Sequence, residues 1–504
     1  MTTDTPHATA GRPAATAALT AAIGARFERL PLCRWHVTVR LIIGAVTFFE
    51  AFDQLLIAYA LPELRAEWQL TTGQTTSLIT VGSLGMLVGA LLSGRLADRV
   101  GRVKVIAACI ALSSVFNLLL TLCASPGPFM ALRFVQGLAI GGEVPVAATF
   151  IAEITRAHRR GRFVLLYELV FPAGLTACAL LAWWLMPLLG WRWMFGLAAV
   201  PGVLCLLVAR YVPESPRWLA DHGRHEAALA TMASIEAKVE KITGEPLPRP
   251  ASAPSAPSVP SAPSAPSAPS APSAPSAPSA LSVPSVASAP RQTARQSAGR
   301  GGLRELLSGR YRRRTLVVSV LWFTGYFVNY GISTWLPTIY GARFHLGLSD
   351  ALLYSTVTSC AGFVGCLAVA LTVDRVGRRH TLAWSLGAAA LCLLLLGLFS
   401  GGSAGGVLIW TSLAAVFFFG ANICLYLYTP ELFPTRVRAL GTSVGGAMNR
   451  LGVILGPIVV GAVYADGALG TVFVTLAAVA LVGSLTAGVA AEETSGRQLE
   501  DVAP

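Results

Sequence analysis

The sequence DRVGRVK at residues 98–104 recurs as DRVGRRH at residues 374–380. A second pair of related segments follows in the same order, AEITRAHRRGR at 152–162 and PELFPTRVRALG at 430–441, and each places an acidic residue several positions before two arginines. Recurrence in a fixed order is the sequence signature of a repeated structural unit. These segments therefore predict a chain made of two similar halves.

The sequence around these repeats is strongly apolar. Of the 504 residues, 54% are hydrophobic and 12% are charged, whereas soluble globular proteins have about 25% charged residues. A helix needs about 20 mostly apolar residues to cross a bilayer. Suitable runs are 37–62, 74–95, 103–123, 128–152, 163–187, 192–211, 315–339, 351–373, 381–400, 407–429, 441–464 and 469–490. We therefore expect an all-α membrane protein with twelve transmembrane helices in two six-helix bundles, which would enclose a solute site near the middle of the membrane.

The arginine and lysine residues gather in alternate short loops, which predicts that these loops and both termini lie in the cytoplasm. The expected organisation is a cytoplasmic tail (1–36), a first bundle (37–211), a cytoplasmic central loop (212–314), a second bundle (315–490) and a C-terminal tail (491–504). The start of the chain lacks the pattern of a signal peptide. The central loop contains a long Ser-Ala-Pro repeat, which we interpret as a disordered or semi-rigid linker without chemistry of its own.

Several classes of function are disfavoured by composition and motifs. The net charge is +13, but the positive residues are dispersed in clusters between apolar runs, so we expect no nucleic-acid partner. Most of the nine cysteines lie in apolar runs without a Cys-x-x-Cys pair, so we expect no metal site and no cofactor. No nucleophile–base set stands out, which argues against an enzyme. The expected partners are the lipid bilayer, a small organic solute and protons, and we expect the protein to act as a monomer.

Five segments together resemble the major facilitator superfamily. GRLADRVGRVK (94–104) is similar to its signature loop, and the others are RFVQGLAIGGE (133–143), PESPRWL (213–219), PELFPTRVRALG (430–441) and EETSGRQLED (492–501). The resemblance covers about residues 29–501 apart from the linker. RLPLCRWH (29–36) and FFEAFD (48–53) resemble the metabolite:proton symporters, including niacin and aromatic-acid carriers. The run 321–337 lacks the QQLSG-like segment of sugar porters.

The resemblance implies a latch that holds the cytoplasmic side closed; the alternative is that these charges serve only as an orientation signal. We expect Gly94 to let helices approach closely and Asp98 to accept from the N-terminus of a neighbouring helix. We also expect the acid–arginine groups to exchange partners during transport or, alternatively, to be exposed pairs of little energy. The latch residues are Gly94, Asp98, Arg99, Gly101, Arg102, Glu153, Arg159, Arg162, Asp374, Arg375, Gly377, Arg378, Glu431, Arg436 and Arg438.

Four of the ionisable residues that lie inside apolar runs are candidates for proton coupling. Glu50 and Asp53 are three residues apart, so they share a helix face, and such acids inside a membrane face the bundle interior. We expect them to carry the proton; the alternative is that hydrogen bonds satisfy both acids and they serve packing only. Arg133 and Glu143 are separated by about 15 Å along a helix, so they cannot pair directly. We expect Arg133 to face an acid of the first helix or a solute carboxylate, and Glu143 to join the proton path or to brace the bundle.

Aromatic and amide side chains inside the later runs suggest where the solute binds. Aromatic faces with scattered amides suit a small ring compound or an organic acid, and the candidate residues are Glu168, Tyr326, Asn329, Tyr330, Asn422 and Tyr426. We therefore expect proton-coupled symport of an aromatic or monocarboxylic acid, nicotinate- or benzoate-like, by alternating access in a cell membrane, with a bacterial inner membrane as the expected location. The alternatives are a sugar:proton symporter, a drug-efflux antiporter and a receptor that does not transport.

Overall fold

The structure is a computed structural model that describes residues 19, 22–27, 29–31, 33–154, 168–248, 305–400, 402–434, 437–465 and 469–495. Within these ranges the structure describes only the backbone of residues 144, 145, 148, 149, 151–154, 310, 400 and 439. The predictions for Glu153, Arg159, Arg162, Arg436 and the Ser-Ala-Pro repeat therefore lie outside what the structure describes.

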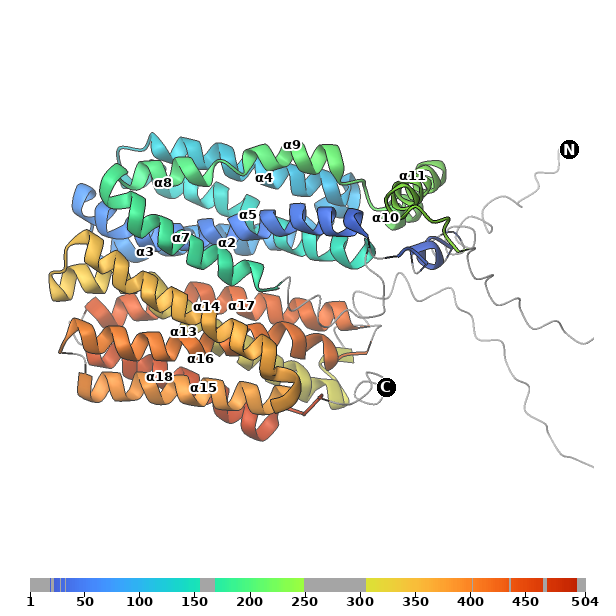
Figure 1. The fold of residues 1–504 in the computed structure, drawn as a ribbon. Helices are drawn as coiled ribbons and strands as arrows, with labels where there is room; N and C mark the ends of the chain where they lie inside the picture. The colour runs from blue at the N-terminus through green and yellow to red at the C-terminus, as the bar shows by residue number, and fades with distance from the viewer. Residues whose placement is uncertain are drawn as a thin grey trace, which may run out of the picture.

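Two groups of long helices lie side by side (Figure 1). The first group contains α2 (Arg34–Trp68), α3 (Thr72–Val100), α4 (Arg102–Thr121), α5 (Pro126–Ile154), α7 (Val170–Leu189), α8 (Trp191–Ala198) and α9 (Gly202–Tyr211). The second contains α13 (Gly309–Phe344), α14 (Leu348–Val376), α15 (Arg378–Leu395), α16 (Ala404–Glu431), α17 (Arg438–Ala465) and α18 (Leu469–Leu485). One-turn π segments, Leu396–Ser400 and Thr486–Ala490, follow α15 and α18. The run predicted over 192–211 is divided between α8 and α9.

The same helix pairings occur in both groups. In the first, α2 packs on α7, α3 on α5, and α4 on α8 and α9; in the second, α13 packs on α17, α14 on α16, and α15 on α18. Across the boundary, α2 contacts α13, α3 contacts α17, and α7 contacts α14. The recurring sequence segments thus correspond to a recurring packing arrangement.

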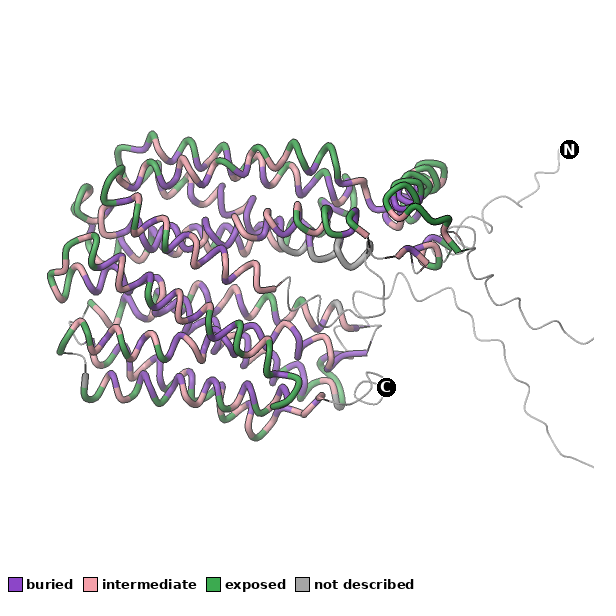
Figure 2. Tube along the Cα trace, viewed as in Figure 1, coloured by how far each residue is buried: buried purple, intermediate pink, exposed green. Residues whose placement is uncertain are grey.

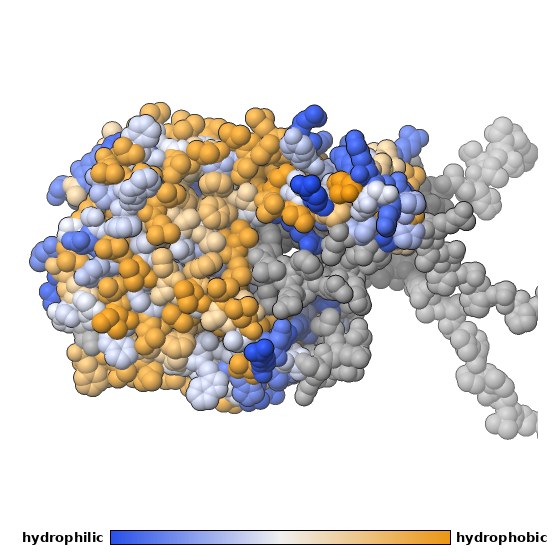
Figure 3. All heavy atoms as spheres, viewed as in Figure 1, coloured by the Kyte–Doolittle hydropathy of each residue, from blue (hydrophilic) through white to orange (hydrophobic). Residues whose placement is uncertain are grey.

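Within the described residues, eleven helices are long and apolar enough to cross a membrane. Helix α5 is not one of these eleven. It has 29 residues and packs against α3 and α4 in the first group. The protein is therefore a multi-pass membrane protein, and the count of twelve spans stays a prediction. Figure 2 shows buried residues along the faces that helices turn toward each other, and Figure 3 shows apolar side chains over much of the visible flank.

Short helices mark one end of the molecule. Helices α10 (Pro216–Asp221) and α11 (His225–Thr243) pack on each other beyond the end of α9, and the start of α2 lies at the same end (Figure 1). Ser215 caps α10 by accepting from the backbone N–H of Trp218 at 3.3 Å, and Pro216 occupies the first helical position, where a missing N–H costs nothing. Positive-inside charge predicts that this is the cytoplasmic end.

An arginine pair ties the segment before α2 to α11. Arg26 donates two hydrogen bonds to the Glu236 carboxylate, at 2.9 and 2.5 Å, and Arg29 donates one at 2.6 Å. Burial raises the pKa of Glu236, but the hydrogen bonds and charges of Arg26 and Arg29 outweigh it, so the pKa lies below its ordinary value. This contribution to stability is therefore present above the unfolded-state pKa and is lost as the pH falls through the lowered folded-state pKa.

Replacing Glu236 by Gln is expected to detach this segment at neutral pH, because the amide cannot compensate two guanidinium groups. Trypsin should then cleave after Arg26 and Arg29 several-fold faster than in the wild type at pH 8, as followed by mass spectrometry. The matched control is Glu226→Gln, an exposed residue of the same helix, which should leave the cleavage rate unchanged. Equal rates in the wild type and Glu236→Gln would contradict the assignment.

Candidate functional site

Asp53 lies at the centre of a buried polar cluster. Its Oδ1 accepts from Nη1 of Arg133 at 3.0 Å, and its Oδ2 accepts from Asn117 at 3.0 Å and from Gln136 at 2.7 Å. Asp53 is 3% exposed and Arg133 is 5% exposed. Both carboxylate oxygens are thus bonded and the charge is paired, which is what a buried carboxylate requires. The structure places Arg133 against an acid of the first long helix, one of the two alternatives that the sequence left open.

Three further residues shape this cluster and were missed in the sequence. Gln136 also donates to Oδ1 of Asn117 at 2.7 Å, and Asn117 donates to the carbonyl of Ala198 at 3.2 Å, so α2, α4, α5 and α8 are linked. Gly82 of α3 provides space, since a Cβ there would lie 3.3 Å from the Arg133 side chain. A lone amide in the apolar run of α4 was the available signal for Asn117.

Glu50 lies on the same helix as Asp53 but has different partners. It is 4% exposed, its Oε1 is 3.9 Å from Nη2 of Arg450 and 3.4 Å from Nε2 of Gln54, and its buried Oε2 has no hydrogen-bond partner. Arg450 belongs to α17, so this ion pair joins the two helix groups. The sequence reasoning missed Arg450, although an arginine inside an apolar run is itself a functional signal.

Glu143 is buried farther along α5, with 5% exposure. Its Oε1 has no hydrogen-bond partner, and its charge acts on Glu50 of α2 and on Cys109 of α4. Arg133 bonds to Asp53 and Gln136 instead, so the structure separates Arg133 from Glu143, as their spacing predicted. Glu143 is thus a buried acid whose charge interacts with that of Glu50.

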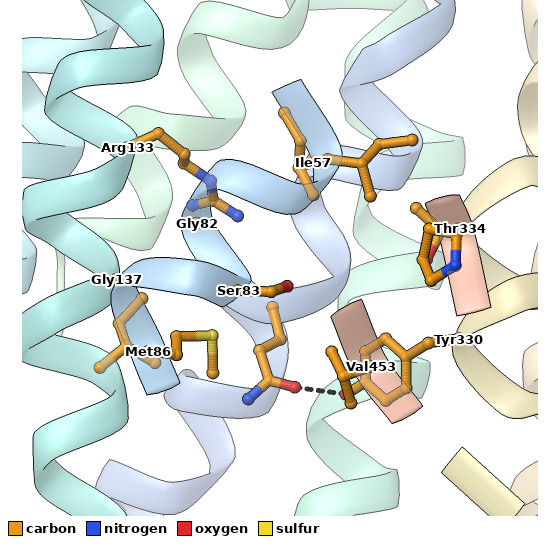
Figure 4. Close-up of a pocket in the computed structure, with 13 residues that line it drawn as sticks. Ile57, Gly82, Ser83, Met86, Arg133, Gly137, Tyr330, Thr334 and Val453 are labelled. Atoms are coloured by element: carbon orange, nitrogen blue, oxygen red, sulfur yellow. Dashed lines mark hydrogen bonds between the residues drawn. The ribbon is translucent and has the colours of Figure 1, made fainter. Parts of the chain in front are cut away.

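One cavity lies between the helix groups beside the Asp53 cluster (Figure 4). It has a volume of about 450 Å³. Arg133 reaches it from α5, Gln54 from α2 and Tyr330 from α13, and the Tyr330 hydroxyl donates to Oε1 of Gln54 across the boundary. Thr334 and Val453 complete the wall of the second group (Figure 4). The cavity therefore changes shape whenever the two groups move apart.

A second cavity, of about 330 Å³, contains most of the predicted solute-binding residues. Its wall combines the carboxylate of Glu168, just before α7, with aromatic and amide side chains from α7, α13 and α16, and Cys366 of α14 completes it. Five of the six candidates line it, namely Glu168, Tyr326, Asn329, Asn422 and Tyr426; the sixth, Tyr330, lines the first cavity. The hydroxyl of Tyr326 donates to that of Tyr426 at 3.1 Å.

The two helix groups are joined by polar contacts far from α10 and α11. Tyr59 of α2 is 3.3 Å from the Ser359 hydroxyl, Thr356 donates to the carbonyl of Ala179 at 2.9 Å, and Thr176 donates to the Ser359 carbonyl at 3.4 Å. Tyr59 lies in the last third of α2 and Thr356 in the first third of α14. Both positions are in the half of the molecule opposite α10, so these contacts join the two groups in that half.

The signature loop of the first group is held by a residue from the segment after α9. Oε1 of Glu214 accepts from the backbone N–H of Arg102 at 3.0 Å and of Val103 at 3.2 Å, at the N-terminus of α4. Asp98 was predicted to be the acceptor at a helix N-terminus, and that prediction is wrong. Asp98 accepts instead from the Nη1 of Arg102, four residues later, at 2.6 Å, and its side chain is 66% exposed. Gly101 has φ +123°, a conformation that allows the sharp turn between α3 and α4.

The second group repeats this arrangement with a residue from the segment after α18. Glu493 accepts from the backbone N–H of Arg378 at 2.9 Å and of Arg379 at 3.1 Å, beside Gly377, whose φ is +91°. Arg378 also forms ion pairs with Asp374 at 2.9 Å and with Glu431 at 3.2 Å. Glu431 thus pairs with the signature-loop arginine rather than standing only with Arg436 and Arg438, as the sequence suggested. Two carboxylates of unrelated sequence segments thereby cap equivalent helices.

Five predicted latch residues are exposed in this structure, namely Gly94, Asp98, Arg99, Asp374 and Arg375. A Cβ at Gly94 would meet nothing within 4 Å. The expectation that Gly94 brings helices together is therefore wrong here. Close packing of α3 on α5 occurs instead at Gly85, Gly89, Gly137 and Gly141, where a Cβ would lie 2.0–2.2 Å from a backbone oxygen of the facing helix.

In the described part of the chain, no group of three His, Cys, Asp or Glu side chains is placed to hold a metal ion.

Comparisons with known proteins agree with this architecture. The chain is 30% identical over 478 residues to "Niacin transporter NiaP" of Acinetobacter baylyi, covering 95% of this chain and 98% of that protein. It is 31% identical over 486 residues to "Organic cation/carnitine transporter 7" of Arabidopsis thaliana, covering 93% of each. The relatives named here are transporters rather than enzymes.

A solved structure of the proton:xylose symporter XylE bound to 6-bromo-6-deoxy-D-glucose superimposes with a TM-score of 0.67 at 17% identity, covering 93% of this chain and 98% of that chain. At this identity the likeness concerns the fold. A family model described as the Major Facilitator Superfamily matches residues 43–444. The chain therefore belongs to the major facilitator superfamily.

Proposed function

We propose that this transporter carries a small organic acid, aromatic or monocarboxylic, together with a proton by alternating access. The observation that carries the proposal is the buried Asp53 carboxylate, paired with Arg133 beside a cavity between the two helix groups. A buried carboxylate in a switching cavity has the chemistry to take a proton on one side of the membrane and release it on the other. The niacin transporter named above supports an aromatic acid as the solute.

Proton binding at Asp53 would change the cluster around it. Neutralising the carboxylate removes the charge that holds Arg133 and leaves the guanidinium uncompensated in a buried site, which is costly. Arg133 lines the first cavity, so a released Arg133 would turn its charge toward that space. Protonation would therefore favour an anion in the cavity, which couples the two ligands in the same direction.

Alternating access requires that the groups separate at one end while they close at the other. The contacts of Tyr59, Thr356 and Thr176 join the groups in the half opposite α10 and α11. We propose that this half is closed and faces outside, as positive-inside charge predicts, and that both termini are cytoplasmic. We also propose that α5 completes a set of twelve spanning helices, and that a single chain is sufficient for transport.

The proposal is tested by uptake into proteoliposomes with an imposed inward proton gradient. Labelled benzoate, nicotinate, xylose and a quaternary ammonium compound are compared at equal concentration. We expect the aromatic acids to accumulate and a proton ionophore to abolish the accumulation. Accumulation of xylose alone would replace this function by sugar:proton symport, and proton-driven export of the cation would replace it by efflux.

One observation favours a second candidate, a cationic solute. Glu168 lines the second cavity with Tyr326 and Tyr426, and none of the residues lining that cavity is an arginine or lysine. An acid beside aromatic faces suits an organic cation, and the Arabidopsis relative is named for organic cations and carnitine. Uptake of the quaternary ammonium compound in the same assay, lost in Glu168→Gln, would favour this candidate.

A further inference from the structure

Arg450 and Glu50 form an ion pair across the boundary between the two helix groups. Nη2 of Arg450, in the middle of α17, lies 3.9 Å from Oε1 of Glu50, and their side chains are 14% and 1% exposed. The separation exceeds hydrogen-bonding distance. The two residues thus attract each other without using the directional donors of the guanidinium group.

Hydrogen-bonding capacity remains open on both sides of this pair. Over the described residues, the structure contains no hydrogen bond from Arg450, although a guanidinium has five N–H donors. Oε2 of Glu50 is buried without a partner, and its Oε1 is no closer than 3.4 Å to Nε2 of Gln54. Asp53, by contrast, has both oxygens bonded at 2.7–3.0 Å. While Asp53 is ionised, Arg133 donates to Asp53 and Gln136, so in this state Arg450 has more donors to offer a ligand than Arg133 has.

Arg450 interacts electrostatically with a residue in the wall of each cavity. Its charge acts on Tyr330, which lines the first cavity, and on Tyr426, which lines the second. Glu168 acts on Tyr426 as well. A carboxylate in the second cavity would be repelled by Glu168 and attracted by Arg450. These two charges therefore orient an aromatic acid with its ring among the tyrosines and its carboxylate toward α17.

We propose that Arg450 binds the carboxylate of the solute and that Glu50 competes for the same guanidinium. This inference rests on the proposed function and assigns its anion-binding residue. An arginine can grip a carboxylate with two parallel N–H donors, which a 3.9 Å pair does not do. The solute therefore gains a bidentate partner at Arg450 that Glu50 does not have.

The competition links solute binding to protonation of Glu50. Six titratable or charged groups interact electrostatically with Glu50. They are Asp53 of its own helix, Cys109 of α4, Glu143 of α5, Tyr330 of α13, Tyr426 of α16 and Arg450 of α17. Asp53 and Glu143 favour a neutral Glu50, whereas Arg450 favours the anion. When the solute takes Arg450, the balance shifts and Glu50 accepts a proton from water. Solute and proton then bind cooperatively.

The test compares pyridine-3-carboxylate with pyridine-3-carboxamide, which share a ring but differ in charge, as ligands of the purified full-length chain between pH 5.5 and 8. Affinity is measured by calorimetry. Arg450→Gln is expected to weaken binding of the carboxylate roughly 10- to 100-fold, the range for hydrogen bonds to charged groups, and to leave the carboxamide unchanged. Arg450→Lys should recover part of the loss. Arg192→Gln, which removes an arginine of the distant pair with Glu67, is the matched control.

Glu50→Gln provides the second arm, because it removes the competitor and keeps Arg450. It should tighten carboxylate binding at pH 8 and flatten the pH dependence seen in the wild type. The inference is overturned if Arg450→Gln binds the carboxylate like the wild type, if both ligands weaken equally, or if Glu50→Gln keeps the wild-type pH dependence. Wild-type binding of neither ligand overturns it together with the proposed function. Wild-type carboxylate binding without proton-driven uptake overturns the proposed function alone.

Discussion

Asp53→Asn is expected to abolish accumulation of the solute against its gradient, so that the internal concentration never exceeds the external one. The amide keeps the shape of the side chain but cannot gain or lose a charge. Exchange of labelled for unlabelled solute without a gradient should persist, because it requires the cavity to change sides but requires no net proton movement. Uptake and exchange are measured in the same proteoliposomes.

Loss of stability is the competing explanation, because Asn leaves Arg133 without its counter-ion. Breaking a buried ion pair costs about 3–5 kcal/mol, and the pair is nearly inaccessible to solvent. Two controls separate the explanations. Glu67→Gln removes an acid of the same helix whose side chain is 38% exposed and should accumulate solute like the wild type. Asp53→Glu keeps the charge and should recover some accumulation. Wild-type accumulation by Asp53→Asn would exclude Asp53 as the coupling residue.

Gly141→Ala is expected to destabilise the first helix group severely, although it adds one methyl group. An ideal Cβ at Gly141 would lie 2.0 Å from the carbonyl oxygen of Met86 on α3. The obstacle is backbone, so no side-chain rotation relieves it, and the helices must separate. Overpacking of this kind costs about 1–3 kcal/mol or more, which should lower the melting temperature in detergent by several degrees.

Gly127→Ala is the matched control on the same helix. A Cβ at Gly127, the second residue of α5, meets nothing within 4 Å. The variant should melt at the wild-type temperature. If Gly141→Ala and Gly127→Ala behave alike, the close packing of α3 on α5 at Gly141 is not present in the protein.

The helices and their duplication follow from local patterns that sequence displays directly. Apolar runs of sufficient length predict spanning helices, and the recurrence of DRVGR predicts equivalent turns, which the structure places at Gly101 and Gly377. The finer assignment failed where it required a partner from a distant segment. The caps of α4 and α15 come from Glu214 and Glu493, more than 100 residues away in sequence, and a turn motif does not reveal its cap.

The site shows the same division. The spacing of Glu50 and Asp53 correctly placed both acids on buried faces of one helix, but their partners differ, because helix rotation directs Asp53 toward α5 and Glu50 toward α17. The spacing alone did not predict these partners. Asn117, Gln136 and Arg450 were each visible as polar residues in apolar runs, and that signal could have marked them as candidates. Their connections depend on tertiary packing.

Substrate-induced proton movement tests the central claim most directly. Proteoliposomes with a weakly buffered exterior and no initial gradient are given an aromatic acid, and the external pH is recorded. We expect alkalinisation when the acid is added to the wild type, as protons enter with it, and in Asp53→Asn no pH change beyond that of protein-free vesicles. Acid entry into wild-type vesicles without alkalinisation, or with equal alkalinisation in Asp53→Asn, would contradict proton coupling through Asp53.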